Sequence, residues 1–342
     1  MNATRRTVLW AAVSMALATA TSAWAQKTEL LVYTALETDQ LKAYTESFQK
    51  TNPNIDLKFV RDSTGVITAK LLAEKANPQA DVVLGVSASS LEIFKSDGML
   101  APYTPVGFDQ LNPTYSDSSR PPSWVGMDVY SAVICYNTVE GQKKNIPAPK
   151  SWADLTKPVY KGQVVMPNPA SSGTGFLDVS GWLQTMGEAN AWKYMDGLHE
   201  NIAQYTHSGS KPCRQAGAGE FVVGVSFDFR GNDVKAKGAP VELIFPTEGL
   251  GWDIEASGIM KNTKHMDAAR KLIDWTATKE ANEAFAKNFV IVSRKDVKAH
   301  LPNLPTDLET KLIKNNFAYS AKNRDAILAE WQKRYAAKSE PK

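Results

Sequence analysis

Residues 29–60 have the sequence ELLVYTALETDQLKAYTESFQKTNPNIDLKFV, which predicts a strand, a helix and a second strand. After an initial apolar run, Leu41, Tyr44 and Phe48 recur at helical spacing. Residues 55–60 then alternate between apolar and polar side chains, as a half-buried strand does. Strands that alternate with helices form a parallel sheet with helices packed on its faces. We therefore expect an α/β fold with doubly wound sheets.

The same alternation continues to about residue 98. Ser63 and Thr64 precede an amphipathic segment, where they can cap a helix, and residues 81–86 form a third apolar strand. In doubly wound sheets, ligands bind beyond the carboxyl ends of the strands. Small polar residues follow each predicted strand, and the candidate ligand-binding residues among them are Thr34, Glu37, Ser63, Thr64 and Ser87.

A glycine-rich loop follows another predicted strand at residues 164–166. This loop, residues 167–175, has the sequence PNPASSGTG and leads into a helix. Glycines let the backbone approach a ligand, hydroxyls donate hydrogen bonds, and the N–H groups at a helix start attract anions. No lysine follows as it would in a nucleotide-binding P-loop. The loop predicts a small-anion site at Ser171, Ser172 and Thr174, and a plain helix cap explains the same pattern.

Two further segments carry candidate ligand groups. Ser210 stands at a predicted helix start, so it offers hydrogen-bond donors for the same anion. Asp228 lies between two phenylalanines, one of them Phe227, and this pattern suits a primary ammonium through an ion pair and cation–π contact. Glu37 is the second acid expected near such a group. Asp228 equally fits a surface acid between two core side chains.

Composition and motif spacing exclude several functional classes. The 342 residues carry 39 basic and 36 acidic side chains, a balance of +3 that does not suit a protein neutralising nucleic-acid phosphates. Residues 85–89 and 224–228 each lack the final glycine of the hydrolase nucleophile elbow. The four histidines have no metal-ligand spacing. We therefore predict no catalytic residue, no metal ligand, no cofactor and no nucleic-acid partner.

Residues 1–25 have the three parts of a secretory signal peptide. Arg5 and Arg6 form a basic segment, residues 8–20 form an apolar run too short to span a membrane, and residues 23–25 (Ala-Trp-Ala) form a cleavage site. The arginine pair is compatible with twin-arginine export as well as with the general secretory route. Cleavage leaves 317 residues with 37 basic and 36 acidic side chains, a net charge of +1.

Cys135 and Cys213 are the two cysteines of the chain. Two cysteines cannot build a disulfide scaffold or an all-cysteine zinc site. Export permits a disulfide between them, and two separate buried thiols fit the sequence equally well. The sequence leaves both possibilities open.

The order of these segments resembles a known family. The leader precedes residues 32–34 (Val-Tyr-Thr), an amphipathic helix and residues 80–83 (Ala-Asp-Val-Val), and residues 147–155 (PAPKSWADL) and 256–259 (Ala-Ser-Gly-Ile) follow. This order is similar to the type II periplasmic solute-binding proteins of ABC importers, in the branch that contains ferric-iron binders. The resemblance covers essentially all of the chain after the leader.

Within that branch, residues 60–65 (VRDSTG), 85–87 (GVS) and 208–213 (SGSKPC) resemble the 2-aminoethylphosphonate-binding group. Iron binders carry adjacent tyrosines near the end of the second-lobe strand, whereas residues 227–229 are Phe-Asp-Phe. This departure counts against iron. The resemblance implies a periplasmic, non-catalytic monomer that captures 2-aminoethylphosphonate and delivers it to the permease and ATPase subunits of an ABC transporter.

The resemblance also implies how the ligand is held. Hydroxyls would meet its phosphonate, and Glu37 and Asp228 would meet its ammonium. Phe227, Trp124 or Tyr130 would form aromatic walls. The expected ligand-binding residues are Thr34, Glu37, Ser63, Thr64, Ser87, Ser171, Ser172, Thr174, Ser210, Phe227 and Asp228.

The implied architecture is two α/β lobes with the ligand cleft between them. Crossover strands near residues 125 and 245 join the lobes, which close over the ligand by a hinge. Arg61 is an alternative, bidentate ligand for the anion. A ferric-iron-binding or polyamine-binding protein of the same fold and a secreted hydrolase are the alternative functions. The expected domains are the signal peptide 1–25, a first lobe of 26–125 plus about 246–300, and a second lobe of 126–245 plus C-terminal helices at about 301–342.

Overall fold

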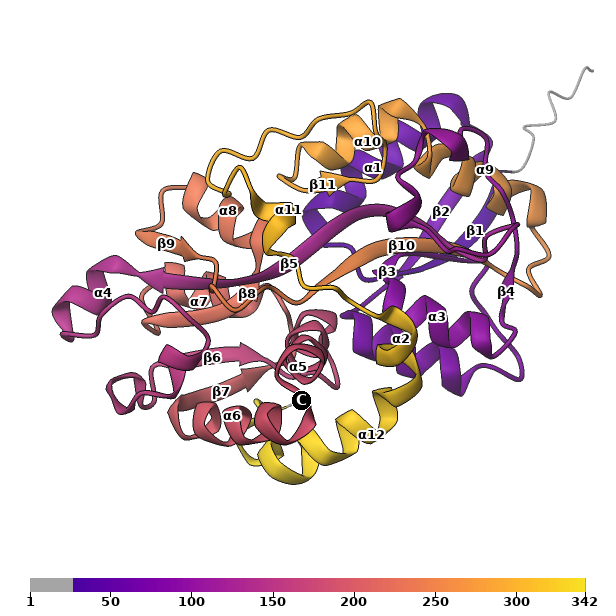
Figure 1. Cartoon of the computed structure of the whole chain (residues 1–342). Coiled ribbons are helices and arrows are strands. Elements are labelled where there is room, and N and C mark those ends of the chain that lie inside the picture. Colours follow the sequence, from indigo (N-terminus) through magenta and orange to yellow (C-terminus); the bar gives the residue numbers. More distant parts are fainter. Residues whose placement is uncertain (1–26, 342) are drawn as a thin grey trace, which may run out of the picture.

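The computed structural model describes residues 27–341 of the chain (Figure 1). The predicted signal peptide, its cleavage after Ala25 and the choice between two export routes concern residues outside this range. Within residues 27–341, no helix combines the length and the apolar character needed to cross a bilayer.

The first lobe is built on a mixed sheet. Its strands are β1 (Thr28–Thr34), β2 (Ile55–Arg61), β3 (Val82–Ser87), β4 (Leu100–Ala101), β5 (Val125–Asn137), β10 (Trp252–Met260) and β11 (Ile291–Val292). The main order is β2-β1-β3-β10-β5. β1 pairs in parallel with β2 and β3, whereas β10 pairs antiparallel with β3 and β5. The three strands predicted near residues 29–34, 55–60 and 81–86 are confirmed.

The second lobe has its own mixed sheet. It contains β6 (Val164–Pro167), β7 (Ile202–Thr206), β8 (Val223–Phe227), β9 (Val241–Ile244) and the second half of β5. The order is β5-β8-β6-β7, with β6 parallel to both of its neighbours and β9 added along β5. The predicted α/β class with two wound lobes is confirmed.

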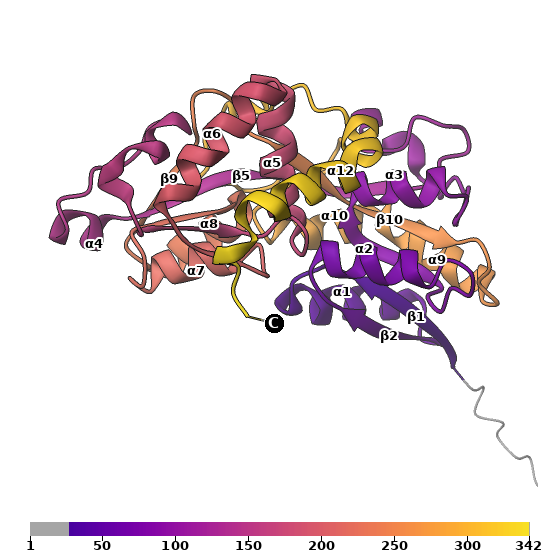
Figure 2. The ribbon, with the colours of Figure 1, turned by 90° about the horizontal axis from the view of Figure 1, so that it is seen from below.

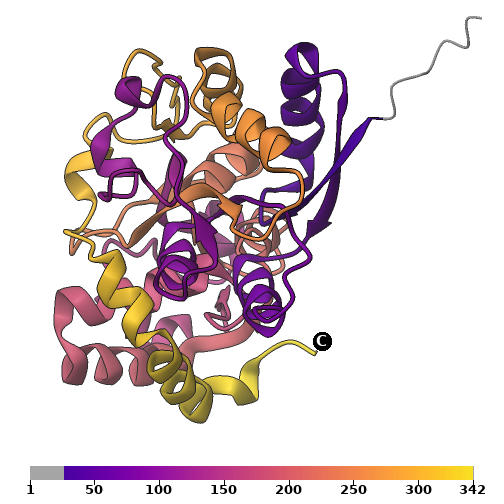
Figure 3. The same ribbon diagram turned by 90° about the vertical axis from the view of Figure 1, so that its right-hand side faces the viewer.

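Helices pack on the sheets on either side of the strands. In the first lobe, α1, α9 and α10 lie on one side and α2 and α3 on the other (Figures 1 and 3). The first-lobe helices are α1 (Thr38–Thr51), α2 (Thr64–Ala73), α3 (Ala88–Ser96), α9 (Met266–Thr276) and α10 (Lys279–Ala286). The second-lobe helices are α4 (Thr138–Lys143), α5 (Gly173–Met186), α6 (Glu188–Asn201), α7 (Lys211–Gly217) and α8 (Asp228–Ala236).

The remaining helical segments are short or C-terminal. They are η1 (Phe108–Gln110), η2 (Pro113–Tyr115), η3 (Ala153–Thr156), η4 (Pro158–Tyr160), α11 (Leu308–Lys311), α12 (Phe317–Tyr335) and η5 (Ala336–Lys338). The long helix α12 runs along both lobes (Figure 2). Near its start Phe317 packs edge-to-face on Trp252 of β10, and near its end Trp331 packs on Tyr205 of β7. The C-terminal helices, expected with the second lobe, therefore contact both lobes, because α12 is long enough to bridge them.

Strand β5 passes from one lobe to the other. Residues 125–131 pair with β10, and residues 132–137 pair with β8 and β9. All of its residues are buried, including the polar side chains of Asp128, Ser131 and Asn137. The chain returns between β9 and β10, through residues 245–251. The lobe boundaries near residues 125 and 245 stay a prediction, and we propose β5 and this return segment as the hinge.

The two cysteines form a disulfide. It joins Cys135 of β5 to Cys213 of α7, whose Cα atoms are 5.4 Å apart. The bridge is fully buried in a small apolar cluster that includes Ala216 and Val234. The structure therefore decides between the disulfide and the two separate thiols that the sequence left open.

Candidate functional site

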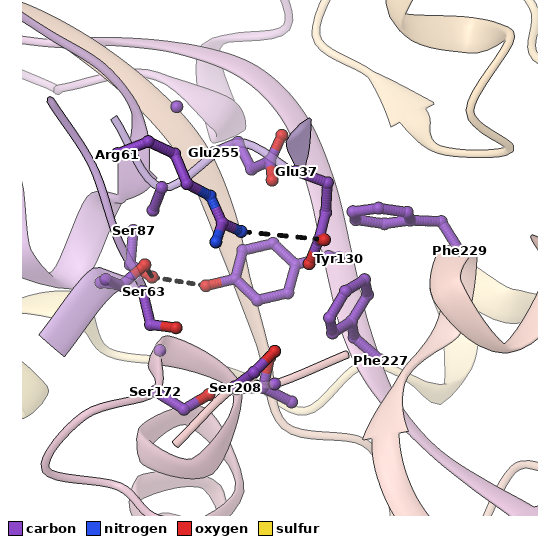
Figure 4. Close-up of a pocket in the computed structure, with 16 residues that line it drawn as sticks. Glu37, Arg61, Ser63, Ser87, Tyr130, Ser172, Ser208, Phe227, Phe229 and Glu255 are labelled. Carbon is purple, nitrogen blue, oxygen red and sulfur yellow. Dashed lines mark hydrogen bonds and ion pairs between the residues drawn. The ribbon is translucent and has the colours of Figure 1, made fainter. Parts of the chain in front are cut away.

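A pocket with about 470 Å³ of empty space lies between the two lobes (Figure 4). Its residues come from the carboxyl ends of β2, β3 and β8, from the segments that follow β1, β2 and β7, from β5 and β10, and from the starts of α2, α5 and α8. The lining consists of Ala35, Glu37, Arg61, Ser63, Thr64, Gly85, Ser87, Tyr130, Ser172, Gly173, Thr174, Ser208, Gly209, Phe227, Phe229 and Glu255.

Three helices begin at the pocket. Ser63, Ser87 and Ser172 are the N-cap residues of α2, α3 and α5. The first backbone N–H groups of a helix have no intrahelical partner and carry partial positive charge. Because these helix starts come from both lobes, they present donors from two sides to a ligand in the pocket. Such an arrangement suits a small anion.

Hydroxyl groups gather at one side of the pocket, which we call the hydroxyl end. Figure 4 shows Ser172 and Ser208 below the ring of Tyr130 and Ser63 and Ser87 to its left, where the Tyr130 phenol is hydrogen-bonded to the Ser87 hydroxyl. Burial raises the pKa of Tyr130 well above its usual value, so the phenol keeps its proton and remains a donor. The hydroxyl end consists of Ser63, Thr64, Ser87, Ser172, Thr174 and Ser208.

Two carboxyl groups lie on the other side of the Tyr130 ring, at what we call the acidic end, Glu37 and Glu255 (Figure 4). Oε2 of Glu37 lies 3.7 Å from Arg61, 3.4 Å from Arg214 and 3.3 Å from Arg230. Glu37 belongs to the first lobe, whereas Arg214 and Arg230 belong to the second. These contacts balance the charge of Glu37 and connect the lobes.

Glu255 has a different environment. It lies on β10 opposite Asp128 of β5, so the two carboxyl groups are neighbours in the sheet. Burial raises the pKa of Asp128 to about 8. Burial and the adjacent charge of Asp128 raise the pKa of Glu255 well above its usual value. At neutral pH this pair therefore holds protons that exposed carboxyl groups would have lost.

The lobes touch directly beside the pocket. The Gly65 N–H, in the first turn of α2, donates to the carbonyl oxygen of Ser171, 2.9 Å away in the other lobe. A Cβ atom at Gly65 would lie 2.2 Å from the carbonyl oxygen of Ala170, so only glycine permits this approach. The structure therefore shows the lobes closed against each other at this edge.

Aromatic side chains form part of the wall. Tyr130 and Phe227 meet edge-to-face with ring centroids 6.1 Å apart, and Phe229 lies 4.5 Å from Phe227. Of the expected walls, Tyr130 and Phe227 line the pocket and Trp124 does not. Trp124 is buried in the first-lobe core instead, where its indole N–H donates to a Glu92 oxygen at 2.8 Å.

The structure brings together most of the residues selected from the sequence. Those that line the pocket are Glu37, Ser63, Thr64, Ser87, Ser172, Thr174 and Phe227. Arg61, the alternative anion ligand, lines it as well. Their contacts with a ligand stay predictions.

Three of the selected hydroxyl residues lie outside the pocket lining. Thr34 is fully buried, and its Oγ1 accepts from the Leu36 N–H, which shapes the turn behind the pocket. Ser171 faces the other lobe through its carbonyl oxygen. Ser210 is buried with its hydroxyl 3.0 Å from that of Ser208, so Ser208 takes the place at the surface of the pocket.

Asp228 also lies outside the pocket lining, and its expected contact with the ligand stays a prediction. The residue is buried at the start of α8, and one oxygen accepts from the Ser131 hydroxyl at 2.8 Å. The other oxygen accepts from the Phe229 N–H at 2.8 Å. Burial raises the pKa of Asp228 to about 6. Its carboxyl group thus faces the shared strand β5.

Several lining residues were not selected from the sequence. Most of these are sequence neighbours of the predicted residues and lie in the same loops and helix starts. Glu255 is the exception, because it is far in the sequence from the predicted site residues; the one local signal is an acidic side chain within a buried strand. The residues not selected are Ala35, Gly85, Gly173, Ser208, Gly209, Phe229 and Glu255.

A metal site is not evident in the described part of the chain. Within residues 27–341, no group of three or more His, Cys, Asp and Glu side chains could hold a metal ion. Tyr130 is the one tyrosine in the pocket lining, and its phenol is engaged with Ser87. The donor set of the pocket is therefore dominated by neutral hydroxyls.

Comparison with known proteins identifies relatives along most of the chain. A 28% identical relative over 248 residues, covering 68% of this chain and 66% of its own, is a probable ABC transporter periplasmic-binding protein of Sinorhizobium fredii. An uncharacterized protein of Haemophilus influenzae is 30% identical over 312 residues, which cover 89% of this chain and 90% of the relative.

A solved structure is also similar. It is the periplasmic binding protein AfuA from Actinobacillus pleuropneumoniae with fructose-6-phosphate bound, with 29% identity and a TM-score of 0.85 over 91% of this chain and 99% of AfuA. The family model described as bacterial extracellular solute-binding protein matches residues 77–321, which is 245 of the 342 residues. The chain therefore belongs to the family of bacterial extracellular solute-binding proteins.

Proposed function

We propose that this protein is the periplasmic solute-binding component of an ABC importer and that its ligand is 2-aminoethylphosphonate. The observation that carries the proposal is the two-ended pocket. At one end, neutral hydroxyls and the starts of three helices converge from both lobes. At the other end lie two carboxyl groups. A small ligand with an anionic group and a cationic group matches both ends.

Neutral donors suit a phosphonate that must be bound and later released. Oriented N–H and O–H groups stabilise the oxygens without a permanent countercharge inside the protein. Arg61 adds positive charge beside the pocket, and part of that charge is balanced by Glu37. The attraction for the anion thus comes from local dipoles, since the net charge of the chain is close to zero.

Closure of the lobes completes the site. In the open form, the hydroxyls of the two lobes separate, so each lobe holds only part of the donor set. Ligand binding then favours the closed form because donors from both lobes reach the same group. The contacts of Arg214 and Arg230 with Glu37 add to this closed form. The closed protein presents one surface to the membrane permease, which receives the ligand.

A thermal-shift and calorimetry panel tests the proposal. The mature protein is measured with 2-aminoethylphosphonate, methylphosphonate, phosphate, fructose 6-phosphate, putrescine and Fe(III). We expect 2-aminoethylphosphonate to bind most tightly and, at about 100 times its Kd, to raise Tm by about 4 °C. The proposal fails if 2-aminoethylphosphonate gives no shift while another compound of the panel does.

A sugar phosphate is the second candidate ligand. The relative AfuA was solved with fructose-6-phosphate, and the hydroxyl end would suit a phosphate ester as well as a phosphonate. Sugar hydroxyls could then donate to the carboxyl groups of the acidic end. The panel separates the two ligands, because only 2-aminoethylphosphonate carries a positive charge.

Polyamine binding, ferric-iron binding and hydrolysis fit the pocket less well. A polyamine has no anionic group to use the hydroxyl end. The pocket lining offers ferric iron a single tyrosine ligand, Tyr130, and its phenol is hydrogen-bonded to Ser87. A hydrolase would need a histidine beside its serine, whereas Ser87 is bonded to Tyr130 and Ser226 is buried and donates to the Gly209 carbonyl at 2.6 Å. Fe(III) and putrescine remain in the panel as direct tests.

A further inference from the structure

We infer that Glu255 is the residue that receives the positively charged end of the ligand. The inference rests on the proposed function, because it concerns the ammonium group of the proposed ligand. The inference gives this role to Glu255 in place of Asp228 and Glu37, the two acids that the sequence suggested.

The other two acids near the pocket are already engaged. Glu37 is surrounded by Arg61, Arg214 and Arg230, each within 3.7 Å of one of its oxygens. An ammonium placed there would meet three positive charges as well as one negative charge. Asp228 is turned away from the pocket toward Ser131. These contacts leave Glu255 as the acid of the lining that is available to a cation.

Glu255 itself has the environment of a binding group. It lines the pocket, and only 8% of its surface is exposed. Within residues 27–341, its Oε2 and the two carboxyl oxygens of Asp128 behind it have no hydrogen-bond partner outside this carboxyl pair. An ionised carboxyl group without a partner is unfavourable at a buried position, so Glu255 keeps its proton in the absence of a ligand; a cation beside it would supply the missing partner and favour loss of that proton.

The backbone of β10 is irregular at this residue. The register against β5 shifts between Glu255 and Ala256, and the register against β3 shifts between Ala256 and Gly258. Such irregularities re-aim side chains, and they are frequent beside functional sites. Here the shift accompanies a buried acid at the surface of the pocket, where a regular core strand would place an apolar side chain.

The two ends of the pocket are close enough for a small zwitterion. Glu255 is the strand partner of Ser87 across β10 and β3, so an acid and a hydroxyl-end residue are neighbours in the sheet. Figure 4 shows Ser87 beside the hydroxyl of Tyr130 and Glu255 above the Tyr130 ring. A phosphonate at the hydroxyl end can therefore place an ammonium two carbon atoms away at the acidic end.

Arg230 of the second lobe has a positive charge that acts on Glu255, but this arginine is already paired with other acids. Arg230 of α8 contacts Glu37 and Asp39 of the first lobe and Asp233 of its own helix, each at 3.3 Å or less. With three carboxylates around it, Arg230 makes no hydrogen bond to Glu255. The acidic end thus contains Glu37, which is paired with arginines of the protein, and Glu255, which remains available to the ligand.

Comparing two ligands isolates the contribution of the ligand's positive charge to the binding affinity. Propylphosphonate has the shape of 2-aminoethylphosphonate with a methyl group in place of the ammonium. In isothermal titration calorimetry, we expect Glu255→Gln to weaken 2-aminoethylphosphonate by at least about tenfold. Propylphosphonate should change by less than about threefold, since the hydroxyl end remains. Glu255→Asp keeps the charge and should restore part of the preference. Glu283→Gln, on the exposed face of α10, is the matched control.

Each outcome has a distinct meaning. A wild-type protein that prefers 2-aminoethylphosphonate and a Glu255→Gln variant that loses this preference support the inference. Equal losses for both ligands, or a preference that disappears in Asp228→Asn and persists in Glu255→Gln, overturn the inference and leave the proposed function intact. A wild-type protein that binds neither phosphonate overturns both. Unchanged circular dichroism of Glu255→Gln shows that the variant is folded.

Discussion

The hydroxyl end and the acidic end of the pocket are built in different ways. Each hydroxyl-end residue lies at or near a strand-to-helix junction, and Ser63, Ser87 and Ser172 are helix caps. The acidic end combines Glu37, which precedes α1, with Glu255 in the middle of β10. Its character depends on arginines from the opposite lobe and on Asp128 of another strand.

This difference separates two physical tasks. The hydroxyl end recognises an anion through groups that are neutral and locally held, so it needs little from the rest of the fold. The acidic end places Glu255 in a buried position, and the pKa of its carboxyl group is raised by burial and by Asp128, a neighbour that is distant in the sequence. We therefore expect the hydroxyl end to provide affinity and the acidic end to provide discrimination between ligands.

Gly65→Ala is expected to break both ends at once. The new Cβ would lie 2.2 Å from the Ala170 carbonyl oxygen in the other lobe, which prevents closure. Alanine is also the better helix former, so the fold should be at least as stable. We expect affinity for 2-aminoethylphosphonate to fall by about 100-fold or more, as for a protein whose binding-competent state is rarely populated.

Calorimetry and thermal unfolding together check this expectation. Gly197→Ala in α6 is the matched control, because its Cβ would only touch Thr156 at 3.4 Å. Small-angle X-ray scattering with saturating ligand should show a larger radius for Gly65→Ala than for the control. Wild-type affinity in Gly65→Ala would show that the contact between Gly65 and Ser171 is not needed for binding.

Thr64→Val should weaken the hydroxyl end alone. The change removes Oγ1, which accepts from the Ser87 hydroxyl at 3.5 Å and faces the pocket, and keeps the shape of the side chain. We expect 2-aminoethylphosphonate and propylphosphonate to lose affinity by a similar factor of about ten. Thr45→Val on α1 is the control. A loss restricted to the aminated ligand would contradict the division of tasks between the two ends.

Asp128→Asn tests whether the ionisation of Asp128, next to the acidic end, destabilises the folded protein as the pH rises. The pKa of Asp128 is raised to about 8 in the folded protein, against 3.8 for an exposed Asp. Between about pH 4 and pH 8 the folded chain holds a proton that the unfolded chain has lost, so the contribution of Asp128 to stability falls as the pH rises. Asparagine does not ionise, so the variant does not lose stability in this way as the pH rises.

Thermal unfolding at pH 5 and pH 8 measures the effect. We expect the Tm of Asp128→Asn minus that of the wild type to be larger at pH 8 by at least about 2–4 °C. Other titratable and charged groups around the Asp128–Glu255 pair set the remaining pH dependence of Tm. Besides Glu255 itself, they are Asp228, Arg230, Tyr44, Glu37 and Tyr130. The exposed Asp325→Asn is the control. An equal Tm difference at both pH values would mean that Asp128 does not titrate in this range.

The hydroxyl end could be predicted from the sequence because its signals are local. A serine or threonine that follows an apolar strand and precedes a helix is both a cap and a ligand group, as Ser63, Ser87 and Ser172 are. Of the acidic end, Glu37 was predicted in the same way because it follows a strand, whereas Glu255 was not predicted. Asp228 has the more suggestive local sequence, yet its carboxyl group is bonded to Ser131.

By itself, the sequence determined the alternation of strands and helices, the α/β class and the hydroxyl groups at the strand ends, because these depend on neighbours within a few residues. The tertiary structure alone decided the pairing of Cys135 with Cys213, the neutralisation of Glu37 by arginines of the other lobe and the place of Glu255 in the pocket. These features depend on contacts between segments far apart in the chain. Charge and burial at such contacts are set by the packing of the two lobes, and no local pattern encodes them.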